Sequence, residues 1–162
     1  MSAMSADKDN IIEILKNLSL FSELNYCAVK ELTYLFSDRV FQGGETIFEE
    51  NDTGNSLLVI ISGEVRITQR ANVSGEETLT VLKKGDFFGE MALLEDLPRS
   101  ATAIAHSDTV IMEIGRERFM HFVEKDPASG VKILITLARS LSARLREADG
   151  KIKAYVNLSQ WI

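Results

Sequence analysis

The sequence predicts a mainly β protein with flanking helices, built on an antiparallel β-roll of the jelly-roll kind. Eight of the ten glycines lie between residues 43 and 115, most of them about ten residues apart. Short runs rich in β-branched or aromatic residues separate these glycines, such as SLLVIIS at 56–62 and TVIMEI at 109–114. Turn signals spaced regularly between short strands are typical of antiparallel barrels and jelly rolls. On both sides of this region, apolar residues recur with the helical period.

The first 36 residues are expected to form N-terminal helices. In NIIEILKNL at 10–18 and YCAVKELTYLF at 26–36, the apolar residues follow the helical period and share one face. The segment LFSEL at 20–24 predicts a break between two helices. Ser22 in this segment is the predicted N-cap of the second helix.

The strands of the β-roll are expected between residues 38 and 114. ISGEV at 61–65 predicts a tight hairpin, and NVSGEE at 72–77 predicts a looser one. Apolar strand residues such as Val65 and Ile67 are candidates to line a ligand site inside the roll.

The last segment, 116–162, is expected to be helical. RERFMHFVEKDP at 116–127 predicts a short helix that stops near Pro127. Beyond it, apolar or small residues recur at alternating steps of three and four, a heptad stripe typical of a helix pair. The stripe comprises Val131, Leu134, Ala138, Leu141, Leu145, Ala148, Ile152 and Tyr155.

Two structural interpretations of this last helix remain open. In the first, Ile133 and Leu137 pack on the β-domain, while the stripe contacts a second copy in a homodimer or another protein partner. In the second, one amphipathic helix lies on its own domain. Gly150 is a potential end of the helix, because glycine costs about 1 kcal/mol in a helix interior.

Length and composition predict one cytoplasmic domain over residues 1–162. The longest apolar run, LLVII at 57–61, is far too short to span a membrane, and the N-terminus lacks the apolar segment of a secretory signal. The one cysteine, Cys27, rules out an internal disulfide. The net charge of −6 argues against broad nucleic-acid binding.

The segment GDFFGEMALLEDLPRSATA at 85–103 holds the residue types that a cyclic nucleotide site requires. Arg99, its only basic residue, offers a planar fork that suits a phosphate. Glu90 offers an acceptor for a ribose 2′-hydroxyl. Gly89 and Ala92 lie at the expected start of a short helix, where backbone N–H groups bind anions and small side chains permit close approach.

The stretch FGEMALLEDLPRSATA at 88–103 resembles the phosphate-binding cassette of the cyclic nucleotide-binding domain family. Members of this family include kinase regulatory subunits, nucleotide-gated channels and catabolite-activator-type transcription factors. Glu90 and Arg99 are nine residues apart, as in the kinase and channel branches. Three further segments share the resemblance, which covers residues 11–157 in all: LSLFSELN at 18–25, FQGGETIFEENDTGNSLLVIISGEVRI at 41–67 and LARSLSARLRE at 137–147.

The resemblance implies a regulatory sensor that binds cAMP or cGMP and couples binding to movement of the C-terminal helix. Glu90 would accept from the ribose 2′-hydroxyl, and Arg99 would pair with the cyclic phosphate. N–H groups of Gly89, Ala92 and Ser100 would complete the phosphate site. The implied ligand-binding set is Phe88, Gly89, Glu90, Met91, Ala92, Arg99, Ser100 and Ala101.

The sequence departs from the activator branch in two places. Ala148 and Asp149 stand where the activators carry a hydroxyl pair that contacts adenine, so Tyr155 or Trp161 is the alternative residue to stack on the base. After the long helix no helix-turn-helix follows, so sequence-specific DNA binding is not expected.

Three alternative functions are weighed against the sensor. One is a degenerate fold that binds no nucleotide and acts only through protein contacts. An enzyme on a β-barrel usually needs several histidines on a metal, whereas His106 and His121 lack ligand-like spacing, so no metal site and no catalysis are expected. The third is a haem or iron–sulfur sensor: one cysteine cannot hold a cluster, and a haem would need His106 or His121 as its ligand, which is disfavoured. No cofactor is therefore expected beyond the cyclic nucleotide itself.

Overall fold

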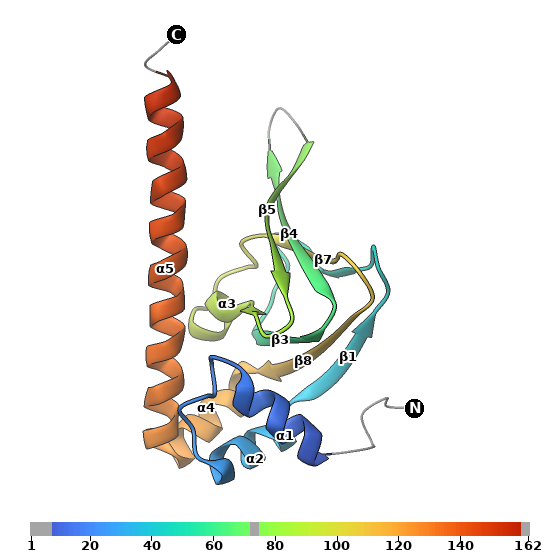
Figure 1. The fold of residues 1–162 in the computed structure, drawn as a ribbon, viewed down its shortest axis with the longest axis vertical. Coiled ribbons are helices and arrows are strands. Elements are labelled where there is room, and N and C mark those ends of the chain that lie inside the picture. Colours follow the sequence, from blue (N-terminus) through green and yellow to red (C-terminus); the bar gives the residue numbers. More distant parts are fainter. Residues whose placement is uncertain (1–7, 72–74, 160–162) are drawn as a thin grey trace.

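Two antiparallel sheets of four strands each form a β-roll, which confirms the predicted fold class (Figure 1). The computed structural model describes residues 8–71 and 75–159. One sheet has the strand order β1-β8-β3-β6 and the other β2-β7-β4-β5. In chain order the strands are β1 Ser37–Phe41, β2 Thr46–Phe48, β3 Ser56–Ser62, β4 Glu64–Ala71, β5 Gly75–Lys83, β6 Phe87–Phe88, β7 Thr102–Ala105 and β8 Thr109–Gly115.

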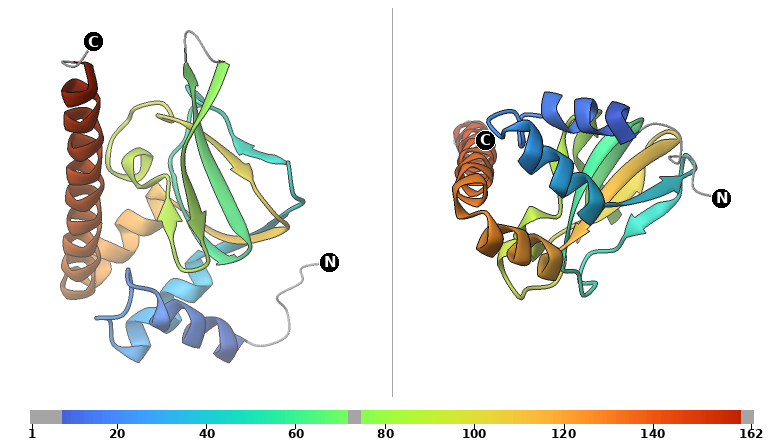
Figure 2. Two further views of the ribbon diagram at one scale, coloured as in Figure 1. Left: turned by 45° about the horizontal axis from the view of Figure 1, so that its top comes forward. Right: turned by 90° about the horizontal axis from the view of Figure 1, so that it is seen from below.

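Five helices accompany the sheets in the described residues: α1 Lys8–Asn17, α2 Tyr26–Leu35, α3 Glu90–Leu94, α4 Arg116–Lys125 and α5 Pro127–Ser159. Helices α1, α2 and α4 gather at one end of the roll (Figure 2). Helix α5 runs along the side of the roll and α3 lies between them (Figure 1). None of the described helices is long and apolar enough to cross a membrane.

Strand β3 separates two apolar clusters, because its alternate side chains point to opposite faces of the sheet. Leu57, Val59 and Ile61 pack with apolar residues of α1, α2, α4 and α5, which together form the helical cluster. Leu58 and Ile60 pack inside the roll. Burial on both faces explains why this strand is an unbroken apolar run. Val65, a predicted cavity residue, is fully buried in the cluster inside the roll and does not line the cavity described below.

The predicted tight hairpin at ISGEV is wrong, because the chain changes sheets there. Gly63 turns with φ of 85°, but β3 and β4 belong to different sheets and do not pair. A Cβ at Gly63 would lie 2.5 Å from Oγ1 of Thr109, so the turn also packs closely. The looser hairpin is confirmed: β4 pairs with β5 from Glu64↔Lys83 to Ala71↔Gly75.

The N-cap of α2 is Asn25, so the prediction of Ser22 is wrong. The Asn25 Oδ1 accepts a hydrogen bond of 2.9 Å from the Ala28 N–H. The Ser22 hydroxyl instead donates to the Ser19 carbonyl at 3.1 Å. Both residue types are good caps, and the cap is the one that directly precedes the helix.

Helix α5 continues through Gly150 as one helix of 33 residues. Ile133 and Leu137 are predicted to pack on the β-domain; they are fully buried in a cluster that combines apolar residues of the helices with one face of β3 and β8. Leu145 of the heptad stripe is 63% exposed, and Val131 and Ile152 are also exposed. At these three positions the stripe therefore does not pack on its own domain. The homodimer stays a prediction.

Asp126 fixes the junction between α4 and α5. Its N–H donates to the Phe122 carbonyl at 2.9 Å, and its carboxylate accepts from the Ser129 N–H at 3.2 Å. Hydrogen bonds from Ser129 hold the pKa of Asp126 below its ordinary value. The carboxylate thus stays ionised and caps the start of α5.

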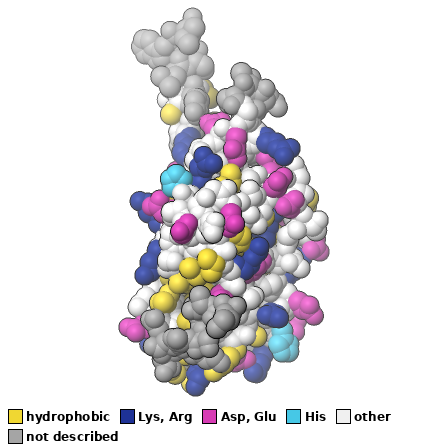
Figure 3. Space-filling model, turned by 90° about the vertical axis from the view of Figure 1, so that its right-hand side faces the viewer, with side chains coloured by type: hydrophobic (Ala, Val, Ile, Leu, Met, Phe, Trp, Pro, Cys, Tyr) yellow, Lys and Arg dark blue, Asp and Glu magenta, His cyan; other side chains and the backbone are white. Residues whose placement is uncertain are grey.

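Charges of both signs are interspersed on the face that Figure 3 shows. A nucleic-acid surface gathers positive charge on one face or along one groove. The described residues of this face show no such gathering.

Candidate functional site

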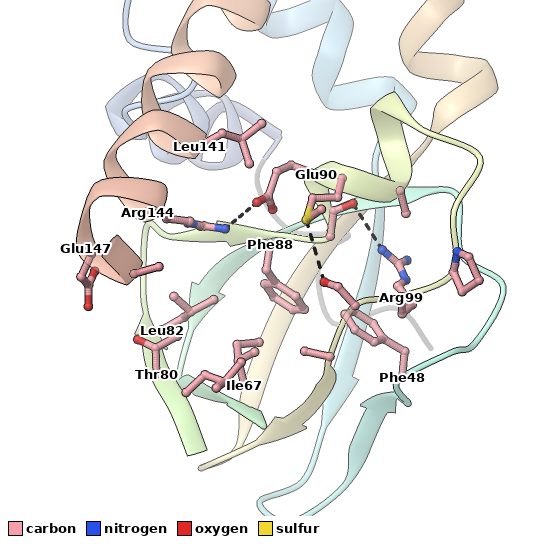
Figure 4. Close-up of a pocket in the computed structure, with 18 of the residues that line it drawn as sticks. Phe48, Ile67, Thr80, Leu82, Phe88, Glu90, Arg99, Leu141, Arg144 and Glu147 are labelled. Carbon is pink, nitrogen blue, oxygen red and sulfur yellow. Dashed lines mark hydrogen bonds and ion pairs between the residues drawn. The ribbon is translucent and has the colours of Figure 1, made fainter. Parts of the chain in front are cut away.

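A cavity of about 570 Å³ lies between the β-roll, the α3 segment and α5 (Figure 4). All eight residues of the predicted ligand-binding set line it. Ile67, also predicted, lines it from β4, together with Leu79, Thr80 and Leu82 of β5. Helix α5 contributes Leu141, Arg144, Glu147, Ala148 and Lys151. Most of this wall is apolar, which suits a ligand with an apolar ring system.

Local backbone geometry brings Glu90 to the cavity. The strand β6 pairs with β3 and ends at Phe88, and Gly89 then adopts φ of 77° as the N-cap of α3. This left-handed conformation favours glycine, and a Cβ there would lie 2.8 Å from the Ser56 carbonyl oxygen. Glu90 follows as the first residue of α3 and is only 4% exposed.

Arg99, which follows α3 in the chain, is also buried, with 6% of its surface exposed. Its Nη1 donates to the carbonyl oxygens of Ser56 at 3.0 Å and of Gly89 at 3.3 Å. Its Nη2 donates to the Ser56 hydroxyl at 2.9 Å. The guanidinium carbon lies 4.2 Å from the centre of the Phe48 ring, a cation–π contact.

The guanidinium of Arg99 retains unused hydrogen-bond donors. Arginine has five N–H donors, and the contacts above use three of them. Its Nε is buried and has no partner among the described residues. Burial lowers the pKa of Arg99, while the carboxylates of Glu113, Asp52 and Glu90 act in the opposite direction. Arginine stays protonated in proteins, so a positive charge is held here.

Gly54 allows Arg99 to occupy this position. A Cβ at Gly54 would lie 2.5 Å from the Arg99 Cζ and even closer to its Nε. The backbone at Gly54 therefore packs directly against the guanidinium. The chain at Arg99 is also tied to this loop, because its N–H donates to the Asp52 carbonyl and its carbonyl accepts from Asn51, both at 2.9 Å.

Glu90 is engaged by Arg144 of α5 rather than free in the cavity. The Arg144 Nη1 lies 2.6 Å from the Glu90 Oε1, and its Nη2 donates to the Phe87 carbonyl at 2.6 Å. Figure 4 shows Arg144 reaching from α5 to Glu90. This ion pair links α5 directly to the α3 segment.

The other residues singled out in the sequence differ in whether they lie at the cavity. The Ser100 hydroxyl lies 3.9 Å from the Met91 Sδ, and Ser100 is exposed. Asp96 pairs with Arg116 and not with Arg99. Ala148 lines the cavity, whereas Asp149 is exposed and does not. The side chain of Tyr155 and all of Trp161 lie outside the described residues.

Sequence reasoning missed four residues that shape the site: Phe48, Gly54, Ser56 and Arg144. The first three precede the cassette by more than 30 residues and carry no signal that links them to Arg99. Arg144 lies beside the heptad stripe, and its charge alone did not distinguish it from a solvated helix residue. His106 and His121 are both exposed, and no described cluster of His, Cys, Asp or Glu is arranged to hold a metal.

Comparison with known proteins gives one family. The family model for the cyclic nucleotide-binding domain matches residues 38–126. The "Cyclic AMP receptor protein" of Thermus thermophilus is 38% identical over 115 residues, which are 70% of this chain and 51% of that protein. The chain spans about half the length of the first curated relatives, 51% and 58%.

Solved structures show the same fold. A cyclic nucleotide-binding domain from Methylobacillus flagellatus superimposes with a TM-score of 0.78 at 29% identity, covering 88% of this chain and 80% of that one. The regulatory domain of Toxoplasma gondii PKA, crystallised with cAMP, superimposes with a TM-score of 0.65 at 27% identity, covering 72% and 45%.

Proposed function

This chain belongs to the cyclic nucleotide-binding domain family, and from that premise we propose that its cavity binds cAMP or cGMP as a regulatory ligand. The observation that carries the proposal is Arg99, a buried cation at the wall of a mostly apolar cavity, whose Nε has no partner among the described residues. An unsatisfied buried donor costs about 1–3 kcal/mol. A phosphate oxygen that reached Nε would remove that cost.

The proposed pose follows from the positions of Arg99 and Glu90 in the cavity wall. The cyclic phosphate contacts Arg99 and the N–H groups of Gly89, Ala92 and Ser100. The ribose 2′-hydroxyl donates to Glu90. The base lies against the apolar wall of Ile67, Leu82 and Leu141.

Titration calorimetry with cAMP and with cGMP tests this function and distinguishes the two ligands. We expect saturable binding of at least one of them, with an increase in melting temperature, because a ligand that binds only the folded state stabilises it. No heat and no melting shift at millimolar ligand would support the alternative module that acts only through protein contacts. The ion pair of Arg144 with Glu90 is the observation that favours that alternative, since it occupies the proposed ribose acceptor.

In the proposed mechanism, Arg144 couples the ligand to α5. A 2′-hydroxyl that donates to Glu90 changes the environment of the carboxylate that holds Arg144. If the ligand binds the two arrangements of α5 unequally, binding shifts the helix between them. The output is proposed to be a changed contact of α5 with a second copy or another protein, with no catalytic step.

Replacing Glu90 with glutamine is expected to weaken cAMP binding about tenfold, because a hydrogen bond to a charged acceptor becomes a neutral one. Binding of 2′-deoxy-cAMP should be equally weak in the variant and the wild type, since it lacks the hydroxyl. Calorimetry measures both affinities. Glu95→Gln, at an exposed neighbouring position, is the matched control. Equal losses for both ligands would place the ribose elsewhere.

We also propose that the exposed stripe of α5 forms a parallel homodimer. Leu145→Asp places a charge in the seam and is expected to yield monomers in sedimentation velocity, while the wild type sediments as a dimer. Ala143→Asp, on the opposite exposed face of the helix, should leave the dimer intact. A monomeric wild type would overturn the proposal.

A further inference from the structure

Ser56 contacts Arg99 with both of its oxygen atoms. Its carbonyl accepts from Nη1 at 3.0 Å and its hydroxyl accepts from Nη2 at 2.9 Å. Ser56 is 5% exposed, and its bonds occupy the end of the guanidinium fork. The donors left unused are Nε and the second proton of Nη2, which lie along one edge and match a phosphate.

Glu113 sets the direction of the Ser56 hydroxyl. The hydroxyl donates its single proton to the Glu113 Oε1 at 2.5 Å. A hydroxyl that has donated its proton offers only lone pairs to other groups. Towards Arg99, Ser56 is therefore an acceptor. Glu113 is held in turn by Arg39 of β1, whose Nη1 lies 3.2 Å from its other oxygen.

The sheet places this pair beside the cassette. Glu113 of β8 lies opposite Leu58 of β3, and Ser56 is two residues before Leu58 on the same face of that strand. Leu58 points into the roll, so Ser56 and Glu113 form the polar end of the inner face. A carboxylate here also offsets the burial of the Arg99 charge.

We propose that Ser56 and Glu113 are positioning residues that hold Arg99 in the orientation that binds the ligand phosphate. Neither residue touches the ligand in this arrangement. They act by fixing one end of the fork, so that the opposite edge needs no reorganisation when a phosphate arrives. The proposal rests on the proposed cyclic nucleotide binding, although its first readout does not need a ligand.

The first readout is the Arg99 Nε–H resonance in a proton–nitrogen spectrum of labelled protein. Because this group is buried and held in place, its proton should exchange slowly with water in the wild type. Ser56→Ala removes the hydroxyl and should accelerate the exchange. Ser62→Ala, the same change at an exposed position of β3, should leave it unchanged.

The second readout is affinity for the cyclic nucleotide. Ser56→Ala and Glu113→Gln should each weaken binding about tenfold, the scale of one hydrogen bond to a charged group. Ser56→Thr keeps the hydroxyl and should restore affinity to within about twofold of the wild type. Thermal melting shows whether each variant is folded.

The two readouts separate the two proposals. If the wild type binds no cyclic nucleotide, the proposed function fails, and the exchange of the Arg99 proton alone decides whether Ser56 positions it. If the wild type binds, and folded Ser56→Ala matches it in both exchange and affinity, the positioning role is overturned.

Discussion

Replacing Arg99 with alanine is expected to weaken cyclic nucleotide binding by roughly 30-fold to 5,000-fold. This range corresponds to about 2–5 kcal/mol, the usual cost of truncating one partner of a buried charge pair. The loss is large because Arg99 is the one cation that the described cassette buries at the cavity wall. Titration calorimetry with cAMP and cGMP measures the change.

Two control variants identify the cause of this loss. Arg99→Lys keeps the charge but lacks the planar fork, so it should recover only part of the affinity. Arg146→Ala removes a cation from an exposed position of α5 that does not line the cavity, and should bind like the wild type. A change below about twofold in Arg99→Ala would mean that the phosphate lies elsewhere, since a buried charge pair costs far more than that.

The cassette was predictable because its residues are close in sequence. Phe88 to Ala92 form one strand end and one short helix, and their order fixes their geometry once Gly89 turns. Arg99 follows within the same local motif. All eight predicted residues therefore line one cavity.

The contacts that complete the site depend on tertiary structure. Ser56 is 43 residues before Arg99 and Arg144 is 54 residues after Glu90, so neither pairing has a local signal. The lack of a local signal also explains why the hairpin predicted at Gly63 is wrong. A glycine turn between two strands looks alike in the sequence whether the strands pair or enter different sheets, and here only the sheet order distinguishes these cases.

The lining of the cavity also changes the interpretation of the heptad stripe. Leu141 and Ala148 of the stripe line the cavity, while Leu145 between them is exposed. One helix therefore presents residues to the ligand site and to solvent within two turns. This arrangement gives a physical route by which a dimer contact on α5 and the ligand influence each other.

Replacing Gly54 with alanine is expected to weaken cyclic nucleotide binding as strongly as the loss of Arg99, although Gly54 donates nothing to the ligand. Its backbone does not require glycine, because its φ is not positive. The new Cβ would lie 2.5 Å from the Arg99 Cζ, closer than any real contact of this kind. The colliding atoms belong to the guanidinium and to the carbon attached to it, which the bonds to Ser56 hold in place. Arg99 must therefore leave its position and give up those bonds.

A double-mutant cycle separates this explanation from general destabilisation. In the Arg99→Ala background, Gly54→Ala should cost little further affinity and little stability, because the colliding side chain is gone. Gly115→Ala is the matched control, since a Cβ there meets no atom within 4 Å. Calorimetry and thermal melting measure all four members of the cycle. Additive losses would show that Gly54 acts independently of Arg99, and full affinity in Gly54→Ala would show that the ligand does not need the observed position of the guanidinium.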